Sequence, residues 1–279
     1  MLLHRSEDRV LAQARATTRR VARTFALACR LLPRGLRDDV YRLYLVFRTL
    51  DDLVDYGDES APQRLAAVEA WCAGEPADSP EVALLIDLDR RRALPRAPLG
   101  EFCAGMRDDL RGPDISSEAE LDVYCHRVAG TVGVVMAAVL GATDPAAPRH
   151  ASALGQAMQR TNILRDIDED LQAGRVYIAR ETLEHFGWST VPPPSQREAL
   201  LRDQIARADE LYELGGEGIA MLPCGRRAIA AAGAMYREIL RQIERDGHGE
   251  RPGRAIVARR RKLLVAARAR VPQQRGQRA

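Results

Sequence analysis

The sequence predicts an all-α protein. Apolar residues recur at steps of three and four along most of the chain, no stretch alternates like a strand, and turns rich in Pro and Gly separate the periodic segments. With 279 residues, of which 46% are hydrophobic and 29% charged, the chain can bury a large core. We find no internal repeat and no low-complexity linker. We therefore expect one helical domain over residues 1–269, followed by a disordered basic tail over 270–279.

Turn and capping signals place the individual helices. Serine followed three residues later by Gln or Glu marks three helix starts, and a Ser-Pro-Glu step marks a fourth. These serines are Ser60, Ser117, Ser195 and Ser79. In chain order, the expected helices span 8–31, 36–56, a segment after Ser60, a segment after Ser79, 99–110, 117–141, the stretch between Pro148 and Gly174, 196–221, 226–246 and 254–269.

Residues 159–170 carry polar side chains at helical spacing. Steps of three, four and four place them on one ridge of a helix, which consists of Gln159, Asn162, Asp166 and Asp170. Apolar neighbours indicate that this ridge borders a core, where an unpaired carboxylate is costly. An oxygen-preferring cation such as Mg²⁺ would explain the pattern, and a solvated acidic face explains it equally well.

A similar ridge lies at residues 44–55. Steps of four, three and four align Tyr44, Arg48, Asp51 and Asp55. The adjacent stripe is apolar, so this helix should be largely buried. Two like charges beside a core repel each other unless a cation bridges them or an arginine such as Arg48 pairs with one of them. An internal Arg–Asp pair therefore competes with a metal site as the explanation.

The two ridges together favour metal-assisted diphosphate chemistry. If they face each other across a cavity, they can hold several Mg²⁺ ions, and each ridge is flanked by an arginine, Arg48 or Arg165. A diphosphate leaving group requires such charge neutralisation and such bidentate donors. The apolar helix walls would hold a hydrocarbon chain. The combination predicts ionisation of an allylic diphosphate in a dry pocket.

Composition argues against several other classes of protein. The net charge of +3, without zinc-type spacing or an RNA-binding signature, predicts no nucleic-acid partner. The five cysteines form no CxxC pair, which favours reduced thiols in a cytoplasm. Residues 1–8 lack a signal-peptide core, and no uncharged apolar run reaches the ~18 residues of a membrane span. We therefore expect a cytoplasmic protein.

Three motifs occur in a fixed order along the chain. They are Arg48-Thr-Leu-Asp-Asp-Leu-Val-Asp55, Tyr124-Cys-His-Arg-Val-Ala-Gly-Thr-Val-Gly133, and Asn162-Ile-Leu-Arg-Asp-Ile-Asp-Glu-Asp170 with its extension Gly174-Arg-Val-Tyr-Ile178. With these motifs, and with weaker marks such as Asp109-Leu110, the chain resembles the squalene/phytoene synthase family, the head-to-head prenyltransferases. The third motif with its extension is highly specific. The resemblance implies an all-α isoprenoid-synthase fold, a helical bundle around a central cavity.

The resemblance also implies roles for individual residues. The metal-binding positions would be Asp51, Asp55, Asn162, Asp166 and Asp170, and the four aspartates with Arg48 would be the catalytic residues. Diphosphate contacts would come from Arg48, Arg165, Arg254 and Lys262. The substrate pocket would be lined by Phe25, Tyr44, Ala129, Val132, Gly133, Gln159 and Tyr236. We expect the small residues at 129, 130 and 133 to leave room for a chain beside their helix, and Gly155, one turn before Gln159 on the same ridge, to leave room beside that ridge.

The implied reaction begins with Mg²⁺-assisted loss of diphosphate from a C15 or C20 prenyl donor. The allylic cation then attacks the double bond of a second donor, and proton loss closes a cyclopropane. Mn²⁺ is a second candidate metal. The use of NADPH is open, because the sequence has no dinucleotide fingerprint and a helical enzyme would not need one.

Several positions depart from the family pattern and leave the acceptor open. Arg160 replaces a usual leucine, Ala179 replaces a usual proline, and Leu27 and Cys29 replace aromatic residues found in some members. Arg160 lies about 200° from Asn162 around the helix, so it should point away from the metal ridge. The alternative functions are prenyl transfer to an aromatic small molecule and terpene cyclisation.

Two further features receive their ordinary interpretations. His126 has no partner at helical spacing, so we expect no catalytic role for it. The basic segment Arg259–Lys262 is typical of a solvated face, and it would also suit peripheral contact with an anionic membrane.

Overall fold

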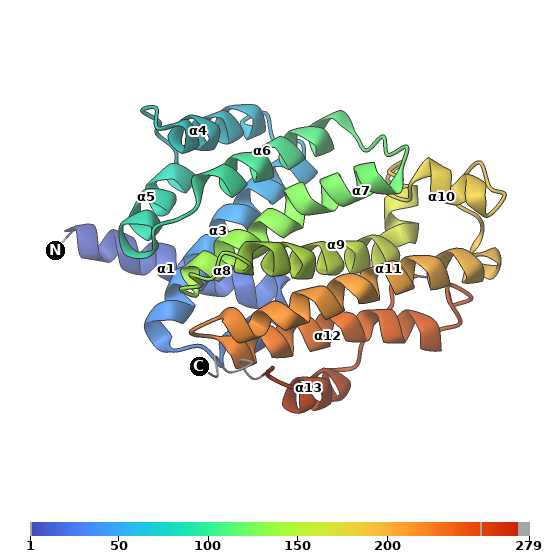
Figure 1. Cartoon of the computed structure of the whole chain (residues 1–279). Helices are drawn as coiled ribbons and strands as arrows, with labels where there is room; N and C mark the ends of the chain where they lie inside the picture. The colour runs from blue at the N-terminus through green and yellow to red at the C-terminus, as the bar shows by residue number, and fades with distance from the viewer. Residues whose placement is uncertain (1, 252, 273–279) are drawn as a thin grey trace.

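The computed structural model describes residues 2–251 and 253–272, and every regular element in those ranges is a helix (Figure 1). The prediction of an all-α fold is confirmed. The α-helices are α1 (Leu2–Val21), α2 (Arg23–Cys29), α3 (Arg34–Asp55), α4 (Ala61–Ala73), α5 (Pro80–Arg92), α6 (Arg96–Arg111), α7 (Glu118–Cys125), α8 (Thr131–Val139), α9 (Ala147–Gln172), α10 (Arg180–His185), α11 (Glu198–Glu217), α12 (Arg226–Arg245) and α13 (Arg259–Arg268). A π-helical turn, η1 (His126–Gly130), joins α7 to α8, and two 3₁₀ turns are η2 (Pro194–Gln196) and η3 (Gly218–Met221).

Helix α9 runs through the middle of the bundle, with α7 and α8 on one side and α11 and α12 on the other (Figure 1). The apolar residues beside the α9 ridge, Ile163 and Leu164 among them, belong to one hydrophobic cluster shared with α11 and α12. The apolar residues beside the α3 ridge, Leu43 and Leu50 among them, belong to another cluster shared with α5, α6 and α8. Each ridge therefore borders a core, as its sequence pattern predicts.

Glycines bring α9 unusually close to η1 and α8. A Cβ atom on Gly155 would lie 2.2 Å from the carbonyl oxygen of Ala129, and one on Gly133 would lie 2.2 Å from that of Ala151. A methyl group does not fit at either distance, so only glycine allows the backbones to approach this closely. The expectation that Gly133 and Gly155 leave room for other groups is wrong on this side, because the neighbouring helix fills the space.

Two of the four serine caps are confirmed. The Ser79 hydroxyl accepts from the backbone N–H of Val82 at 3.1 Å, and the Ser117 hydroxyl accepts from that of Glu120 at 3.2 Å. Each thereby satisfies one of the free donors at a helix start.

The other two predicted caps are wrong. Ser60 donates its hydroxyl to Asp58 Oδ1 at 2.6 Å, and its backbone N–H binds the same oxygen at 2.8 Å. The Asp58 carboxylate, a stronger acceptor, thus closes this turn. Ser195 lies within η2, and α11 starts three residues later, after Arg197.

Some helix boundaries also differ from the predictions. The expected helix over 8–31 is broken at Ala22, which has φ −108° and ψ 58°. The expected helix over 117–141 contains η1, and the segment 254–258 precedes α13 without being helical. Helix α10 was not expected from the sequence. In the predicted tail, residues 273–279 lie outside the described residues, and the domain boundary at 269 stays a prediction.

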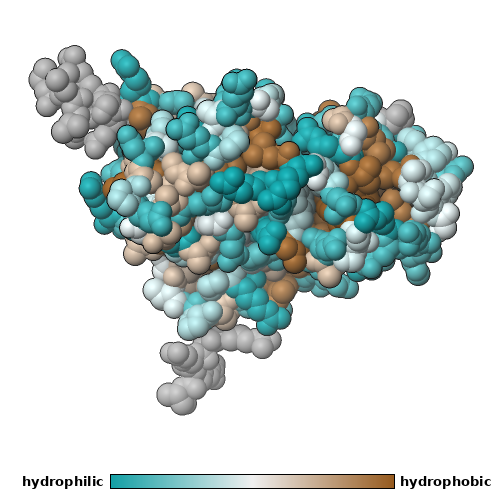
Figure 2. Space-filling model, turned by 90° about the horizontal axis from the view of Figure 1, so that it is seen from above, coloured by the Kyte–Doolittle hydropathy of each residue, from teal (hydrophilic) through white to brown (hydrophobic). Residues whose placement is uncertain are grey.

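The surface is largely polar. Figure 2 shows hydrophilic residues over most of the face seen from above, with hydrophobic residues in separated areas. None of the helices in the described residues combines the length and the apolar composition that crossing a membrane requires.

Candidate active site

The α3 ridge is held by an internal arginine. Arg48 donates from Nη1 to Asp51 Oδ2 at 2.8 Å and also pairs with Asp52, while its Nε is buried without a partner among the described residues. The pKa of Asp51 is raised to about 7, mainly by burial. The charge of Asp55 adds to the rise, and the charge of Arg48 opposes it. Water moderates this effect, because 38% of the Asp51 side chain is exposed. In this state Arg48 neutralises Asp51, which is the internal Arg–Asp pair that the sequence offered as the alternative to a metal site.

The α9 ridge receives arginines from two elements. Arg165 Nε lies 2.7 Å from Asp166 Oδ1, and Arg254, from the segment before α13, brings its own Nε within 2.8 Å of the same oxygen. Asn162 donates from Nδ2 to Gln159 Oε1 at 3.2 Å. The Oδ1 atom of Asn162 is buried, and it has no hydrogen-bond partner among the described residues.

Arg175 links the two ridges. It follows α9 in the chain, and its Nη1 donates to Asp55 Oδ1 on α3 at 3.3 Å. Burial, followed by the charges of Asp166, Glu169 and Asp55, raises the pKa of Asp170 to about 6, while Arg175 opposes the rise. The two acidic ridges therefore lie within electrostatic range of each other, as the sequence hypothesis required.

A tyrosine-bound aspartate adjoins this region. Tyr124 on α7 donates to Asp109 Oδ1 on α6 at 3.0 Å, and Tyr177 approaches the same oxygen at 3.5 Å. The two tyrosine rings stack with centroids 5.3 Å apart. Burial raises the pKa of Asp109 to about 6; the Tyr124 hydrogen bond lowers it and the charge of Asp55 raises it. Sequence reasoning gave these three residues no role, although all three lie in or beside the recognised motifs.

The predicted pocket residues come from several helices. Phe25 on α2 and Tyr44 on α3 lie with ring centroids 5.5 Å apart. Burial raises the pKa of Tyr44 to about 12, with Arg48 opposing and Tyr236 on α12 adding to the rise. Lys262 donates to the Thr24 hydroxyl at 3.0 Å. All seven predicted pocket residues are half-buried: Phe25, Tyr44, Ala129, Val132, Gly133, Gln159 and Tyr236.

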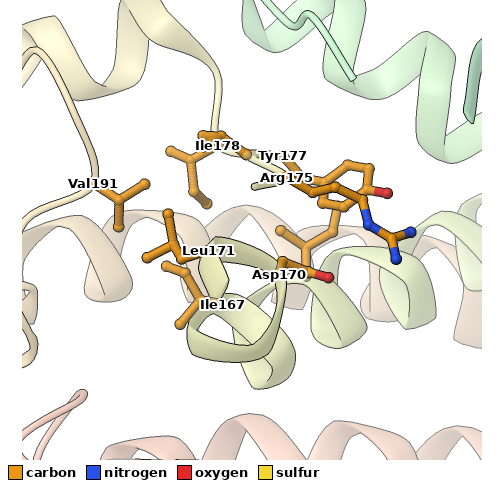
Figure 3. Close-up of a pocket in the computed structure, with 9 residues that line it drawn as sticks. Ile167, Asp170, Leu171, Arg175, Tyr177, Ile178 and Val191 are labelled. Atoms are coloured by element: carbon orange, nitrogen blue, oxygen red, sulfur yellow. The ribbon is translucent and has the colours of Figure 1, made fainter. Parts of the chain in front are cut away.

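A small pocket lies beside the α9 ridge. Figure 3 shows the apolar side chains of Ile167, Leu171, Ile178 and Val191 on one side, and the polar ends of Asp170 and Arg175 on the other. The empty space beside these side chains is about 190 Å³, part of which is open solvent. Even with that solvent counted, it stays below the roughly 300 Å³ at which ligand pockets begin, so this pocket is too small for a prenyl chain.

The donor set fits hard divalent cations. Carboxylates from two facing ridges and the unpaired amide oxygen of Asn162 are the oxygen ligands that Mg²⁺ prefers. Among the described residues, no three His, Cys, Asp or Glu side chains converge closely enough to hold one ion by themselves. Mg²⁺ commonly takes only one or two protein carboxylates and completes its shell with water and substrate phosphate, so the donor set remains suitable.

Two singled-out residues have structural partners. Arg160 points away from the ridge, as its helical position predicts, and its Nη2 binds Glu118 at 2.8 Å while its Nη1 binds Gln204 at 3.1 Å. The partners of His126 come from other helices and not from helical spacing along its own segment. Its Nδ1 lies 2.8 Å from Ser152 Oγ and its Nε2 lies 2.9 Å from Glu101 Oε2. Glu101 lies on α6, His126 in η1 and the buried Ser152 on α9, so these hydrogen bonds join the three elements.

Comparisons with known proteins identify the family of the chain. The family model described as squalene/phytoene synthase matches residues 18–262. The chain is 35% identical over 276 residues to the 15-cis-phytoene synthase of Synechococcus elongatus, covering 90% of this chain and 89% of that protein. It is 36% identical over 255 residues to a phytoene synthase of Thermus thermophilus, covering 87% and 86%.

Solved structures show the same fold. A dehydrosqualene synthase in complex with ligand superimposes with a TM-score of 0.86 at 26% identity, covering 95% of this chain and 96% of that one. A squalene synthase from Alicyclobacillus acidocaldarius superimposes with a TM-score of 0.75, also at 26% identity, covering 88% and 96%. The isoprenoid-synthase fold that the motifs implied is confirmed. The chain belongs to the squalene/phytoene synthase family.

Proposed function

We propose that this chain is a Mg²⁺-dependent prenyltransferase that couples two prenyl diphosphates head to head. One observation carries the proposal: Arg175 joins two acidic ridges, and Asp51, Asp55 and Asp166 on them pair with the kind of arginine that a diphosphate would need. The similarity to phytoene synthases at 33–36% identity supports the same reaction.

The arginines act first, by exchanging partners. Arg48, Arg165 and Arg254 currently bind the ridge carboxylates, and the incoming diphosphate offers them a more highly charged bidentate acceptor. Lys262 contributes a fourth cation beside Thr24. Once these arginines bind the diphosphate, the ridge carboxylates that they held become free to act as metal ligands.

Asp51, Asp55, Asp166, Asp170 and Asn162 would then hold the metal. When bound, Mg²⁺ would neutralise the charge that develops on the departing diphosphate. The buried Oδ1 of Asn162, which has no partner among the described residues, would supply a further acceptor. Mn²⁺ has the same preference for oxygen ligands and should substitute.

The half-buried wall would protect the allylic cation. Phe25, Tyr44 and Tyr236 present aromatic groups there, and ring faces attract a cation while the apolar surroundings exclude water. With water excluded, the double bond of the second prenyl diphosphate would be the nucleophile that reacts with the cation. A C15 or C20 donor fits the proposal, a cytoplasmic location stays a prediction, and NADPH use is open.

Product analysis tests the proposal. The purified chain is incubated with Mg²⁺ and either farnesyl or geranylgeranyl diphosphate, and the extract is examined by mass spectrometry. We expect a C30 or C40 hydrocarbon, or its cyclopropyl diphosphate precursor, and we expect chelator to abolish it. Parallel reactions contain Mn²⁺ instead of Mg²⁺, or added NADPH. Failure to consume either donor alone would refute the proposal.

The same experiment separates the alternative functions. A product that appears only after an aromatic acceptor is added would identify an aromatic prenyltransferase. A monomeric C15 or C20 hydrocarbon would identify a terpene cyclase. Either outcome would replace head-to-head coupling while leaving the diphosphate site intact.

A further inference from the structure

Helix α13 and the residue Ile256 ahead of it expose apolar side chains. No residue of α13 is buried. Ile256 is 77% exposed, Leu263 45% and Leu264 40%. Exposed leucines that stand alone are ordinary, but here they share a short segment with a group of arginines.

The arginines on this segment divide into two groups. Arg254 and Arg261 bind Asp166 and Glu238. Arg259, Arg260 and Arg268 are exposed, and they have no acidic partner within residues 9–251 and 253–272. We call Ile256, Arg259, Arg260, Leu263, Leu264 and Arg268 the α13 surface.

The inner side of the segment is anchored, which fixes the direction of the α13 surface. Val257 is buried in the cluster shared with α9 and α11, and Lys262 binds Thr24 on α2. Val265 and Ala266 pack against buried alanines of α12. Arg260, Leu263 and Leu264 lie at helical steps of three and four, so they share the opposite side. In Figure 1, α13 lies at the lower edge of the bundle, outside α12.

We propose that the α13 surface docks on an anionic lipid bilayer. Its three exposed arginines match negatively charged headgroups, and its leucines and isoleucine are the groups that enter the boundary between headgroups and acyl chains. A second copy of the chain is a poor occupant, since a symmetric contact would bring two basic faces together. Nucleic acid would use the arginines but offers little to exposed Leu and Ile, and the α13 surface has no aromatic ring for stacking on bases.

This inference rests on exposure and charge and does not need the proposed reaction. If that reaction holds, docking also has a consequence for the product. Arg254 and Lys262, which reach the site from the same segment, would lie next to the bilayer, and an apolar C30 or C40 product would meet lipid close to where it forms.

Vesicle co-sedimentation of the full chain, without substrate, tests the proposal. We expect binding to vesicles of equal phosphatidylcholine and phosphatidylglycerol, weak binding to pure phosphatidylcholine, and loss of binding in 0.5 M salt. The pair Leu263→Ser and Leu264→Ser, and the triple Arg259→Gln, Arg260→Gln and Arg268→Gln, should each lower the partition coefficient about tenfold or more.

Matched controls make the same kinds of change at other exposed positions. The pair Leu31→Ser and Val123→Ser removes two apolar side chains that are 54% and 50% exposed. The triple Arg90→Gln, Arg111→Gln and Arg202→Gln removes the same three charges from other helices. Circular dichroism checks that every variant remains folded. The controls should bind like the unaltered chain.

Three results would overturn the proposal. The first is equal binding of the α13 variants and their controls. The second is tight binding to heparin or RNA that depends on the arginines and not on the leucines, which would make the α13 surface a polyanion site. The third is a dimer in analytical ultracentrifugation that the Leu263→Ser and Leu264→Ser pair dissociates. Each can be reached with a catalytically inactive protein, so failure here is distinct from failure of the proposed reaction.

Discussion

Arg175 Nη1 lies 3.3 Å from Asp55 Oδ1, and this contact spans the two acidic ridges. Both side chains are about 40% exposed, so the ion pair itself contributes little to folding stability, at most about 1 kcal/mol. Its importance lies in position, because Arg175 also opposes the rise in the pKa of Asp170. A single guanidinium therefore stabilises negative charge on both ridges.

Arg175→Gln should impair turnover much more than stability. We expect kcat/KM to fall roughly 10–100-fold, because misplacing one ridge relative to the other disturbs the geometry of the site. The melting temperature should move by only a few degrees. Arg202→Gln, which breaks the exposed pair with Glu198, is the control and should change neither quantity. Unchanged kinetics in Arg175→Gln would show that the contact is incidental.

Asp51→Asn and Asp166→Asn should each lower kcat by about 10³-fold or more, because an amide binds Mg²⁺ far less well than a carboxylate. The fold should be retained, since burial already disfavours the charged form of Asp51. Steady-state assays and circular dichroism measure the two effects. Asp58→Asn, an exposed carboxylate just beyond α3, is the control. Near-normal activity in either ridge variant would exclude that residue as a metal ligand.

Arg160→Leu should destabilise the protein by about 3–5 kcal/mol, because it leaves the Glu118 carboxylate buried without a counter-charge, with only Thr182 and Gln204 still donating to it. Only 4% of the Arg160 side chain is exposed. Urea denaturation measures the loss, and the double variant Arg160→Leu with Glu118→Gln should recover part of it. Activity per folded molecule should be preserved, since Arg160 points away from the ridge. A fully stable single variant would contradict this account.

Asp109 should make stability depend on pH. Its pKa is raised from 3.8 to about 6 in the folded protein, so the folded state binds more protons than the unfolded state between these values. Its contribution to the free energy of unfolding is therefore present below about pH 4 and is lost as the pH rises through 6. Relative to Asp109→Asn, the unaltered chain should lose on the order of 1–2 kcal/mol over this range, measured by denaturation in chelator. Parallel curves for the two proteins would show that the carboxylate is not perturbed.

Relations within one helix could be predicted from the sequence. The alignment of Asp51 with Asp55, and the outward direction of Arg160, follow from the helical period alone. The sequence predicts the first residue of α3 to within two positions and its last residue to within one, because Pro33 and Gly57 mark the two ends of the helix.

Relations between helices were not accessible in the same way. The pairs Arg175–Asp55 and Tyr124–Asp109 join residues 120 and 15 positions apart, and only the packing of the bundle brings them together. A competing hydrogen bond also made one capping prediction wrong. Ser60 has a capping sequence, but Asp58 lies two residues away with a stronger acceptor and binds it instead.

The π-helical turn at His126–Gly130 determines which residues of its two flanking helices meet their neighbours. Its closing bond runs from the Thr131 N–H to the His126 carbonyl, five residues back instead of four. Deleting one residue here would restore an α-turn and rotate α8 by about 100° relative to α7, which would separate Gly133 from α9 or Tyr124 from Asp109. A substitution in this turn keeps that register where a deletion shifts it, but Gly130 is constrained, because a Cβ atom there would lie 2.6 Å from Ser152 Oγ. Relatives that keep both contacts must keep the same number of residues between positions 124 and 133.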